Sequence, residues 1–171
     1  RLSERVGRQN VMRAARELGI SSPLPNSPSV ALGTAGVSLL ELTSAYAAVA
    51  SGHYPIKPRG LPLSPDDKGF SAFFSRGGVL DRDRDWGPML DLLWASANEG
   101  TGKRAALAVP TFGKTGTTQN NRDALFIGFA GNLVVGVWVG RDDNKSLGKI
   151  SGGTVPAEIW RNVMSSALAV D

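Results

Sequence analysis

The chain has 171 residues, of which 42% are hydrophobic and 20% charged, so it can form a folded core and is not a wholly disordered protein. It contains no run of about 18 apolar residues, which excludes a membrane-spanning helix. Nineteen basic and fifteen acidic residues give a formal net charge of +4, and the basic residues are scattered, so we predict no nucleic-acid partner.

The helical pattern is strongest in the N-terminal half of the sequence. Apolar residues recur at helical spacing over residues 1–18. A second helix is predicted over residues 37–50, where Ser38 and Glu41 have the spacing of a capping box. Because the chain begins inside a helical pattern at Arg1, and not at a methionine, we expect it to be part of a longer protein.

The middle of the sequence is predicted to be less regular. Prolines make residues 51–78 loop-like, although residues 54–57 could form a short edge strand. The charge run 82–85 indicates a solvated turn, and a third helix follows over residues 86–98. We expect the single histidine, His53, to be an exposed loop residue.

The last third of the sequence has the pattern of an antiparallel sheet. Strands are predicted at about residues 111–118, 123–130 and 133–140, and a closing helix at residues 154–169. Gly131 and Asn132 are a two-residue turn signal, so the second and third strands should form a hairpin. This order of elements predicts an α+β fold, with an antiparallel sheet flanked by helices.

Residue types exclude several kinds of site. The chain has no cysteine, which excludes disulfides, thiolate metal ligands and cysteine catalysis. One histidine cannot form a multi-histidine metal site. We therefore expect no metal and no cofactor.

One motif stands out, Gly-Lys-Thr-Gly-Thr-Thr over residues 113–118. A phosphate-binding loop would need a glycine at position 108, where the chain has Ala108, and a helix directly after Thr115. Neither condition is met, because the motif leads into a strand. The alternative is the Lys-Thr-Gly triad of serine penicillin-recognising enzymes, which lies on an edge strand beside the nucleophile.

The residues around this motif resemble class A penicillin-binding proteins, the bifunctional peptidoglycan synthases. The matching stretches are residues 113–129, 133–144, 152–153, 156–160 and Met164, with residues 31–33, 37–47, 99–102 and Ala105 upstream. The resemblance covers nearly all of the chain, but only about the second half of the family's transpeptidase domain. It implies a β-lactamase/transpeptidase-like fold, with residues 1–171 as the C-terminal portion of a partial domain.

The resemblance also implies roles within the triad. Lys114 would supply positive charge and assist proton transfer, and the Thr117 amide would be one oxyanion donor, so these two are the predicted catalytic residues. The predicted substrate-binding residues are Thr115, Gly116, Thr117 and Thr118. Thr115 and Thr117 would hold a carboxylate, and Gly116 would give clearance. Thr118 could equally be an ordinary strand residue.

Two further motifs of the family, Ser-x-x-Lys with the nucleophile and Ser-x-Asn, should precede the helix with which this chain begins. Ser146-Leu-Gly-Lys149 matches the first in letters, but Gly148 and the charged residues before it indicate a loop and not a helix start. Ser96-Ala-Asn98 matches the second, but it lies at the end of a predicted helix. We therefore expect the nucleophile to lie outside these residues.

The implied function is that of a serine D,D-transpeptidase, which cross-links peptidoglycan stem peptides ending in D-Ala-D-Ala and is acylated by β-lactams. Its place would be the extracytoplasmic (periplasmic) face of the bacterial inner membrane, anchored by a segment not in this chain. The chain alone would be inactive and would pack on the missing N-terminal half of the same domain. The alternative is a non-catalytic module with a degenerate transpeptidase fold, which binds peptidoglycan or a partner protein.

Related enzymes share the triad but fit the sequence less well. Class B transpeptidases carry it, yet the Trp-Val-Gly-Arg-Asp-Asp-Asn stretch at residues 138–144 resembles class A. Serine β-lactamases also carry it, but the helix over residues 37–50 and the hairpin do not resemble that branch. The resemblance therefore favours class A.

Overall fold

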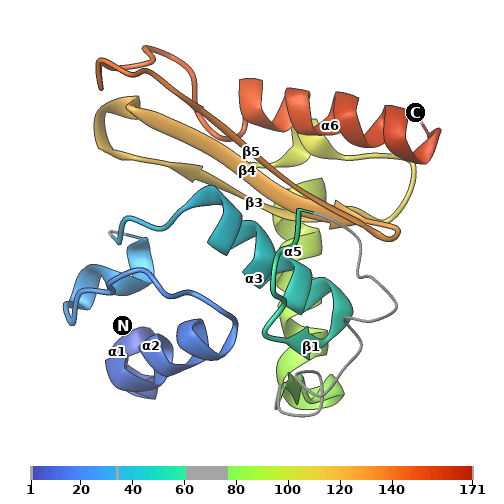
Figure 1. Ribbon diagram of the computed structural model, residues 1–171. Helices are drawn as coiled ribbons and strands as arrows, with labels where there is room; N and C mark the ends of the chain where they lie inside the picture. Colours follow the sequence, from blue (N-terminus) through green and yellow to red (C-terminus); the bar gives the residue numbers. More distant parts are fainter. Residues whose placement is uncertain (1, 34, 61–76, 171) are drawn as a thin grey trace. The chain divides into compact units, whose positions relative to one another are not determined.

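The computed structural model describes residues 2–33, 35–60 and 77–170. They form two compact units, one ending at Leu80 and the other beginning at Asp81 (Figure 1). Helices and antiparallel strands give the chain the predicted α+β fold. Within the described ranges, no helix is long and apolar enough to cross a membrane. Most of the predicted loop over residues 51–78 lies outside these ranges.

The first unit contains helices α1 (Leu2–Val6), α2 (Arg8–Glu17) and α3 (Leu39–Ser51), the 3-10 turn η1 (Pro28–Leu32), and the short strands β1 (His53–Tyr54) and β2 (Gly78–Val79). The single helix predicted over residues 1–18 is wrong, because Gly7 interrupts it with a φ of 86°. This left-handed conformation is open to glycine but incompatible with a continuous right-handed helix. The glycine thus divides the segment into α1 and α2.

The start of α3 is fixed by a network around one carboxylate. Ser38 and Glu41 form the predicted capping box, with the Ser38 hydroxyl accepting the Glu41 amide at 3.2 Å. The Glu41 carboxylate also accepts the backbone amides of Ser21 and Ser22 at 2.8 and 3.0 Å, together with both of their hydroxyls. These hydrogen bonds, those from Ser21 first, hold the pKa of Glu41 well below its usual range. The carboxylate therefore joins the α2–η1 connection to α3.

His53 is exposed, as predicted, but it lies in β1 rather than in a loop and pairs with Val79 of β2. The short strand is at residues 53–54 and not at 54–57. Pro55 follows it directly, and a proline has no amide hydrogen with which to continue a ladder.

The second unit contains the π-helical turn η3 (Arg82–Trp86), the helices α5 (Gly87–Asn98) and α6 (Val155–Leu168), the 3-10 turns η4 (Lys103–Ala105) and η5 (Gln119–Asn121), and the strands β3 (Phe112–Thr117), β4 (Asp123–Ala130) and β5 (Leu133–Gly140). The strands form one antiparallel sheet in the order β3–β4–β5, which makes β3 an edge strand. Strands β4 and β5 form the predicted hairpin, with Gly131 in the left-handed conformation at its turn.

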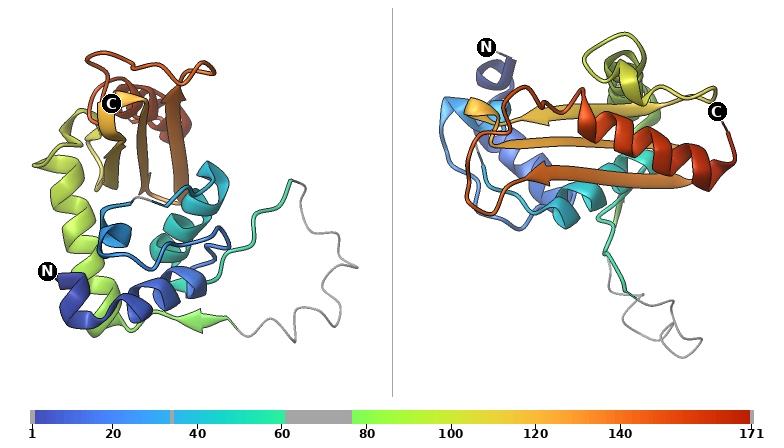
Figure 2. Two further views of the ribbon diagram at one scale, coloured as in Figure 1. Left: turned by 90° about the vertical axis from the view of Figure 1, so that its left-hand side faces the viewer. Right: turned by 90° about the horizontal axis from the view of Figure 1, so that it is seen from above.

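The register of the sheet decides which side chains enter the core. Thr115 pairs with Phe126, and Phe126 pairs with Val137, so these three share one face. Helix α6 packs against β4 and β5, and runs beside the sheet in the right-hand view of Figure 2. The core of the unit is formed by Ala97, Ala105, Phe126, Ala130, Ala157, Trp160 and Met164.

Trp160 and Trp138 differ in environment. Trp160 is fully buried, meets the Phe126 ring edge-on at 5.2 Å between centroids, and donates to the Val135 carbonyl at 3.0 Å. Trp138 is 48% exposed, because the pleat turns it to the face opposite Val137. Its ring lies over Gly140, where a Cβ atom would be 2.0 Å from the indole. Trp138 therefore lies outside the core of the unit.

Candidate active site

The Lys-Thr-Gly motif lies on the edge strand of the sheet. The last four residues of β3 are Lys114, Thr115, Gly116 and Thr117, and Thr118 follows the strand. The Thr118 amide donates to the Asp123 carbonyl at 3.0 Å, so it faces β4. Because backbone groups alternate in direction along a strand, the amides and carbonyls of Thr117 and Thr115 point to the outer side of β3.

Lys114 lies at this outer side. Its side chain is exposed, and its Nζ donates to the Thr115 carbonyl at 3.0 Å and approaches Thr115 Oγ1 at 3.5 Å. The ammonium group thus sits beside the backbone groups that β4 does not use. This places a fixed positive charge where an anionic group reaching the edge of the sheet would meet it.

The hydroxyl groups of Thr115 and Thr117 lie on the face of the sheet that α6 covers. Each hydroxyl is within hydrogen-bond distance of a residue in a loop. Thr115 Oγ1 lies 2.7 Å from Thr101 Oγ1, in the loop between α5 and η4. Thr117 Oγ1 accepts the Gly152 amide at 3.0 Å, from the loop before α6. Two loops that are distant in sequence therefore orient the two threonines.

Glycines allow one of these loops to lie directly on the strand. A Cβ atom on Gly152 would be 2.3 Å from the Leu125 carbonyl and 2.5 Å from the Gly116 carbonyl. A Cβ atom on Gly153 would be 2.2 Å from the Thr101 carbonyl. Since the opposing atoms are backbone, any larger residue would push the loop away from β3. The Gly152 amide can reach Thr117 for this reason.

Gly116 has a packing constraint of its own. A Cβ atom there would be 2.8 Å from Leu125 Cγ, its partner across the ladder. Leu125 therefore already occupies the space beside Gly116 on that face. The predicted clearance for a substrate stays a prediction, and it concerns the outer edge of β3.

Beyond the triad, Thr118 and Trp138 are tied to Asp123 at the start of β4. Asp123 accepts the Trp138 indole N–H at 3.1 Å and the Thr118 hydroxyl at 3.2 Å, while its amide donates to Thr118 Oγ1 at 2.8 Å. Asp123 thus anchors the β3–β4 connection. Thr118 has a structural role here, and its predicted substrate contact stays a prediction.

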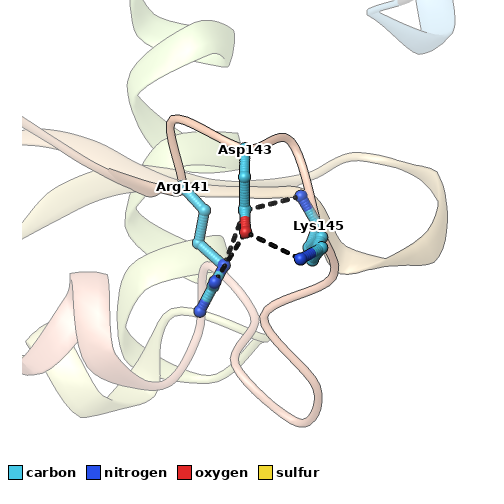
Figure 3. A network of polar contacts seen from close by, with 3 residues as sticks. All are labelled: Arg141, Asp143 and Lys145. Atoms are coloured by element: carbon cyan, nitrogen blue, oxygen red, sulfur yellow. Dashed lines mark hydrogen bonds and ion pairs between the residues drawn. The ribbon is translucent and has the colours of Figure 1, made fainter.

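The loop after β5 is ordered by a small ionic network (Figure 3). Asp143 lies between Arg141, which binds both of its carboxylate oxygens at 2.7 and 2.8 Å, and Lys145, whose Nζ is 3.3 Å away. The hydrogen bonds from Arg141 are the main reason why the pKa of Asp143 is lowered. Two hydrogen bonds join the same loop to Asn121 of η5. The Leu147 amide donates to the Asn121 carbonyl, and the Asn121 side-chain amide donates to the Gly148 carbonyl, both at 2.7 Å.

The carboxylate of Asp143 is already neutralised by Arg141 and Lys145. Among the described residues, no group of three or more histidine, cysteine, aspartate or glutamate side chains could hold a metal ion.

Residues 146–149 and 96–98, which match Ser-x-x-Lys and Ser-x-Asn in sequence, lie in different surroundings. Ser146 and Lys149 lie in an exposed loop, where Ser146 Oγ accepts the Gly148 amide at 3.1 Å and Gly148 has a φ of 67°. They are not one turn apart on a helix. Asn98 ends α5 and donates to the Thr111 carbonyl at 2.8 Å, which ties the helix to the segment before β3.

Sequence reasoning found the triad but assigned no role to Thr101 or Gly152. Both occur in stretches that carried the family resemblance, Gly-Thr-Gly at residues 100–102 and Gly-Gly at residues 152–153. Their contacts join residues that are 14 and 35 positions apart. No local pattern could predict such pairs.

Several known proteins with similar sequences are penicillin-binding proteins. The chain is 38% identical to penicillin-binding protein 1A of Aquifex aeolicus (strain VF5) over 168 residues, which are 95% of this chain and 23% of that protein. It is 33% identical to penicillin-binding protein 1A of Neisseria meningitidis serogroup A over 158 residues, or 86% of this chain and 20% of that protein. Penicillin-binding protein 2D of Bacillus subtilis (strain 168) is 30% identical over 174 residues, with 95% and 25% covered.

A solved structure shows a similar fold. The crystal structure of penicillin-binding protein 1A from Haemophilus influenzae matches with a TM-score of 0.66 and 23% identity, over 94% of this chain and 30% of that chain. No family model matches the chain. The chain spans about a fifth to a quarter of the length of the curated relatives described above.

A three-stranded antiparallel sheet with Lys-Thr-Gly on its edge strand, and a helix packed on one face, defines a transpeptidase-like α+β region. The curated relatives identify this region as that of the class A penicillin-binding proteins, to which the chain is similar over most of its own length.

Proposed function

We propose that this chain supplies the Lys-Thr-Gly wall of the active site of a serine D,D-transpeptidase, which cross-links peptidoglycan stem peptides and is acylated by β-lactams. The observation that carries the proposal is the edge position of β3, with the Lys114 ammonium at its outer side. The hydroxyls of Thr115 and Thr117 are held in place by contacts with Thr101 and Gly152. An extended peptide ending in a carboxylate suits such an edge, because the strand offers backbone groups and positive charge together.

The residues of the Lys-Thr-Gly wall, residues 114–118, would have different roles. Lys114 would raise the local positive potential and assist proton transfer from the nucleophile. Thr115 and Thr117 would bind the terminal carboxylate of D-Ala-D-Ala or of a β-lactam. The outward direction of the Thr117 amide supports its proposed role as an oxyanion donor. Gly116 would let the substrate backbone approach, and Thr118 would contact the substrate just beyond the end of β3.

The chain would depend on sequence outside its 171 residues for the nucleophile. Ser146 and Lys149 lack the helical arrangement in which a lysine can take the proton of a serine. The partner would be the other half of the same domain, which would carry Ser-x-x-Lys and Ser-x-Asn. The proposed location is extracytoplasmic, where peptidoglycan is cross-linked, with the anchor in a segment outside this chain.

The test is acylation of the whole protein by a fluorescent penicillin. Replacing Lys114 by alanine should slow acylation by about 10²-fold or more, the effect of removing one preorganised electrostatic group from an active site. The melting temperature should stay unchanged, because the Lys114 side chain is exposed.

Lys149→Ala is the matched control, since it removes the same charge from an exposed lysine in the loop after β5. Labelling of this variant should equal that of the wild type. Equal labelling of the Lys114→Ala variant and the wild type would refute the role of Lys114. A whole protein that is not labelled at all would favour the non-catalytic binding module instead.

A further inference from the structure

The contacts of the Thr115 and Thr117 hydroxyls decide whether their hydrogens are available to a ligand. A hydroxyl has one donor hydrogen and two acceptor lone pairs. The Gly152 amide is only a donor, so its 3.0 Å contact makes Thr117 Oγ1 an acceptor and leaves the Thr117 hydrogen free for a ligand. This arrangement suits an anionic ligand, which can only accept hydrogen bonds.

Thr115 can be in the same state only if its neighbour donates to it. Thr101 Oγ1 lies 2.7 Å from Thr115 Oγ1, and either hydroxyl could be the donor. The Lys114 ammonium, which has no lone pair, approaches Thr115 Oγ1 at 3.5 Å. When Thr101 donates, Thr115 keeps its hydrogen, and both threonines of the wall present donors to the same ligand.

The position of Thr101 is defined by close packing on both sides. The next residue, Gly102, is buried, and a Cβ atom there would be 2.9 Å from the Phe126 ring. The Thr101 carbonyl lies against Gly153, where a Cβ atom would be 2.2 Å away. The loop therefore cannot move toward or away from β3 without displacing the core or the Gly152–Gly153 segment.

We propose that Thr101 is a positioning residue of the carboxylate subsite: its hydroxyl donates to Thr115, so that Thr115 and Thr117 both donate to the carboxylate of the ligand. The inference rests on the proposed function, because the ligand is the one proposed above. Thr101 would not touch the reacting atoms, and its effect would pass through Thr115 alone.

The experiment measures the kinetics of acylation of the whole protein by benzylpenicillin, with the binding constant separated from the acylation rate constant. Thr101→Val keeps the shape and removes the hydroxyl, while Thr101→Ser keeps the hydroxyl. Thr101→Val should weaken binding before acylation by up to about tenfold, because it removes the hydrogen bond between two neutral hydroxyls that orients Thr115. Thr101→Ser should restore most of it.

Two further measurements separate positioning from a general structural role. The penicillin methyl ester has no carboxylate, so Thr101→Val should change its acylation little. In a Thr115→Val background, Thr101→Val should have no additional effect, because the two residues act as one unit. If the melting temperature of the valine variant falls, Thr101→Ala is compared with Thr101→Ser in the same way.

Each result has a defined meaning. Wild-type kinetics in the variants without a hydroxyl, a serine variant as impaired as the valine one, or additive effects with Thr115→Val would each overturn the role of Thr101 while the proposed function stands. Failure of the wild-type protein to be acylated would instead overturn the proposed function, and this inference with it.

Discussion

Single side chains hold this chain together at points where its segments would otherwise be independent. Glu41 is the clearest case, because one carboxylate caps α3 and also binds the amides and hydroxyls of Ser21 and Ser22. Asp123 acts similarly at the β3–β4 connection, where it joins Thr118 to Trp138 of β5. Both are acidic side chains that accept several hydrogen bonds, including ones from residues distant in the sequence.

The lowered pKa of Glu41 predicts how stability changes with pH. A carboxyl whose pKa is lower in the folded state stabilises the fold above its unfolded pKa of about 4.3, and this contribution is lost as the pH falls toward the folded value. Glu41→Gln should therefore lower the melting temperature at pH 7, and the difference from the wild type should shrink below about pH 4.

Circular dichroism melts from pH 7 to pH 3 measure this difference. The control is Glu17→Gln, which removes an exposed carboxylate whose partner, Arg13, is 4.0 Å away. A melting difference for Glu41→Gln that stays constant over the whole pH range would contradict the lowered pKa.

At the scale of elements, the sheet of the second unit depends on α6. The helix presents Ala157, Trp160 and Met164 to the face that carries Phe126, and all three are fully buried. Its opposite side is open, with Ile159 and Val163 exposed by 40% and 46%. Trp160 and its neighbours in α6 thus cover the sheet face on which the side chains of Thr115 and Thr117 lie.

Trp160→Ala should destabilise the protein by about 3–5 kcal/mol, the usual cost of replacing a buried tryptophan by alanine. The change removes the ring contact with Phe126 and the hydrogen bond to Val135 together. Urea unfolding followed by circular dichroism measures the free energy. Val163→Ala, on the exposed side of the same helix, should cost less than about 1 kcal/mol, and equal losses in the two variants would contradict the assignment of the core.

At the scale of the whole molecule, the chain forms two compact units, and the second carries the Lys-Thr-Gly wall. The wall offers positive charge, hydroxyl groups and backbone donors, on which the proposed binding of a carbonyl substrate depends. A covalent step would also need a serine activated by a nearby base. The described arrangement of Ser146 and Lys149 does not provide one.

We therefore expect the 171-residue chain by itself to gain no mass when incubated with benzylpenicillin. Intact-mass spectrometry before and after incubation makes the measurement, with an active penicillin-binding protein as the positive control. A covalent adduct would place a nucleophile within the chain, and peptide mapping together with Ser146→Ala would then identify it.

Local sequence signals predicted much of the second unit. The turn at Gly131 and the alternation of the flanking strands set the pairing of β4 with β5, because a two-residue turn leaves little choice of register. The capping box at Ser38 and Glu41 was equally readable, since its two residues are three apart. The interruption at Gly7 was missed, because the apolar period continues on both sides of it.

The sequence by itself thus determined the α+β class, the hairpin and the place of Lys114, Thr115 and Thr117 on a strand, because these follow from turn chemistry and from the period of apolar residues. Only the tertiary structure decided that Trp138 is exposed, and that Thr101 and Gly152 hold the threonines of the wall. These contacts join β3 to loops that are distant in the sequence. They depend on how closely the glycine backbones pack on β3, and no local sequence pattern predicts that packing.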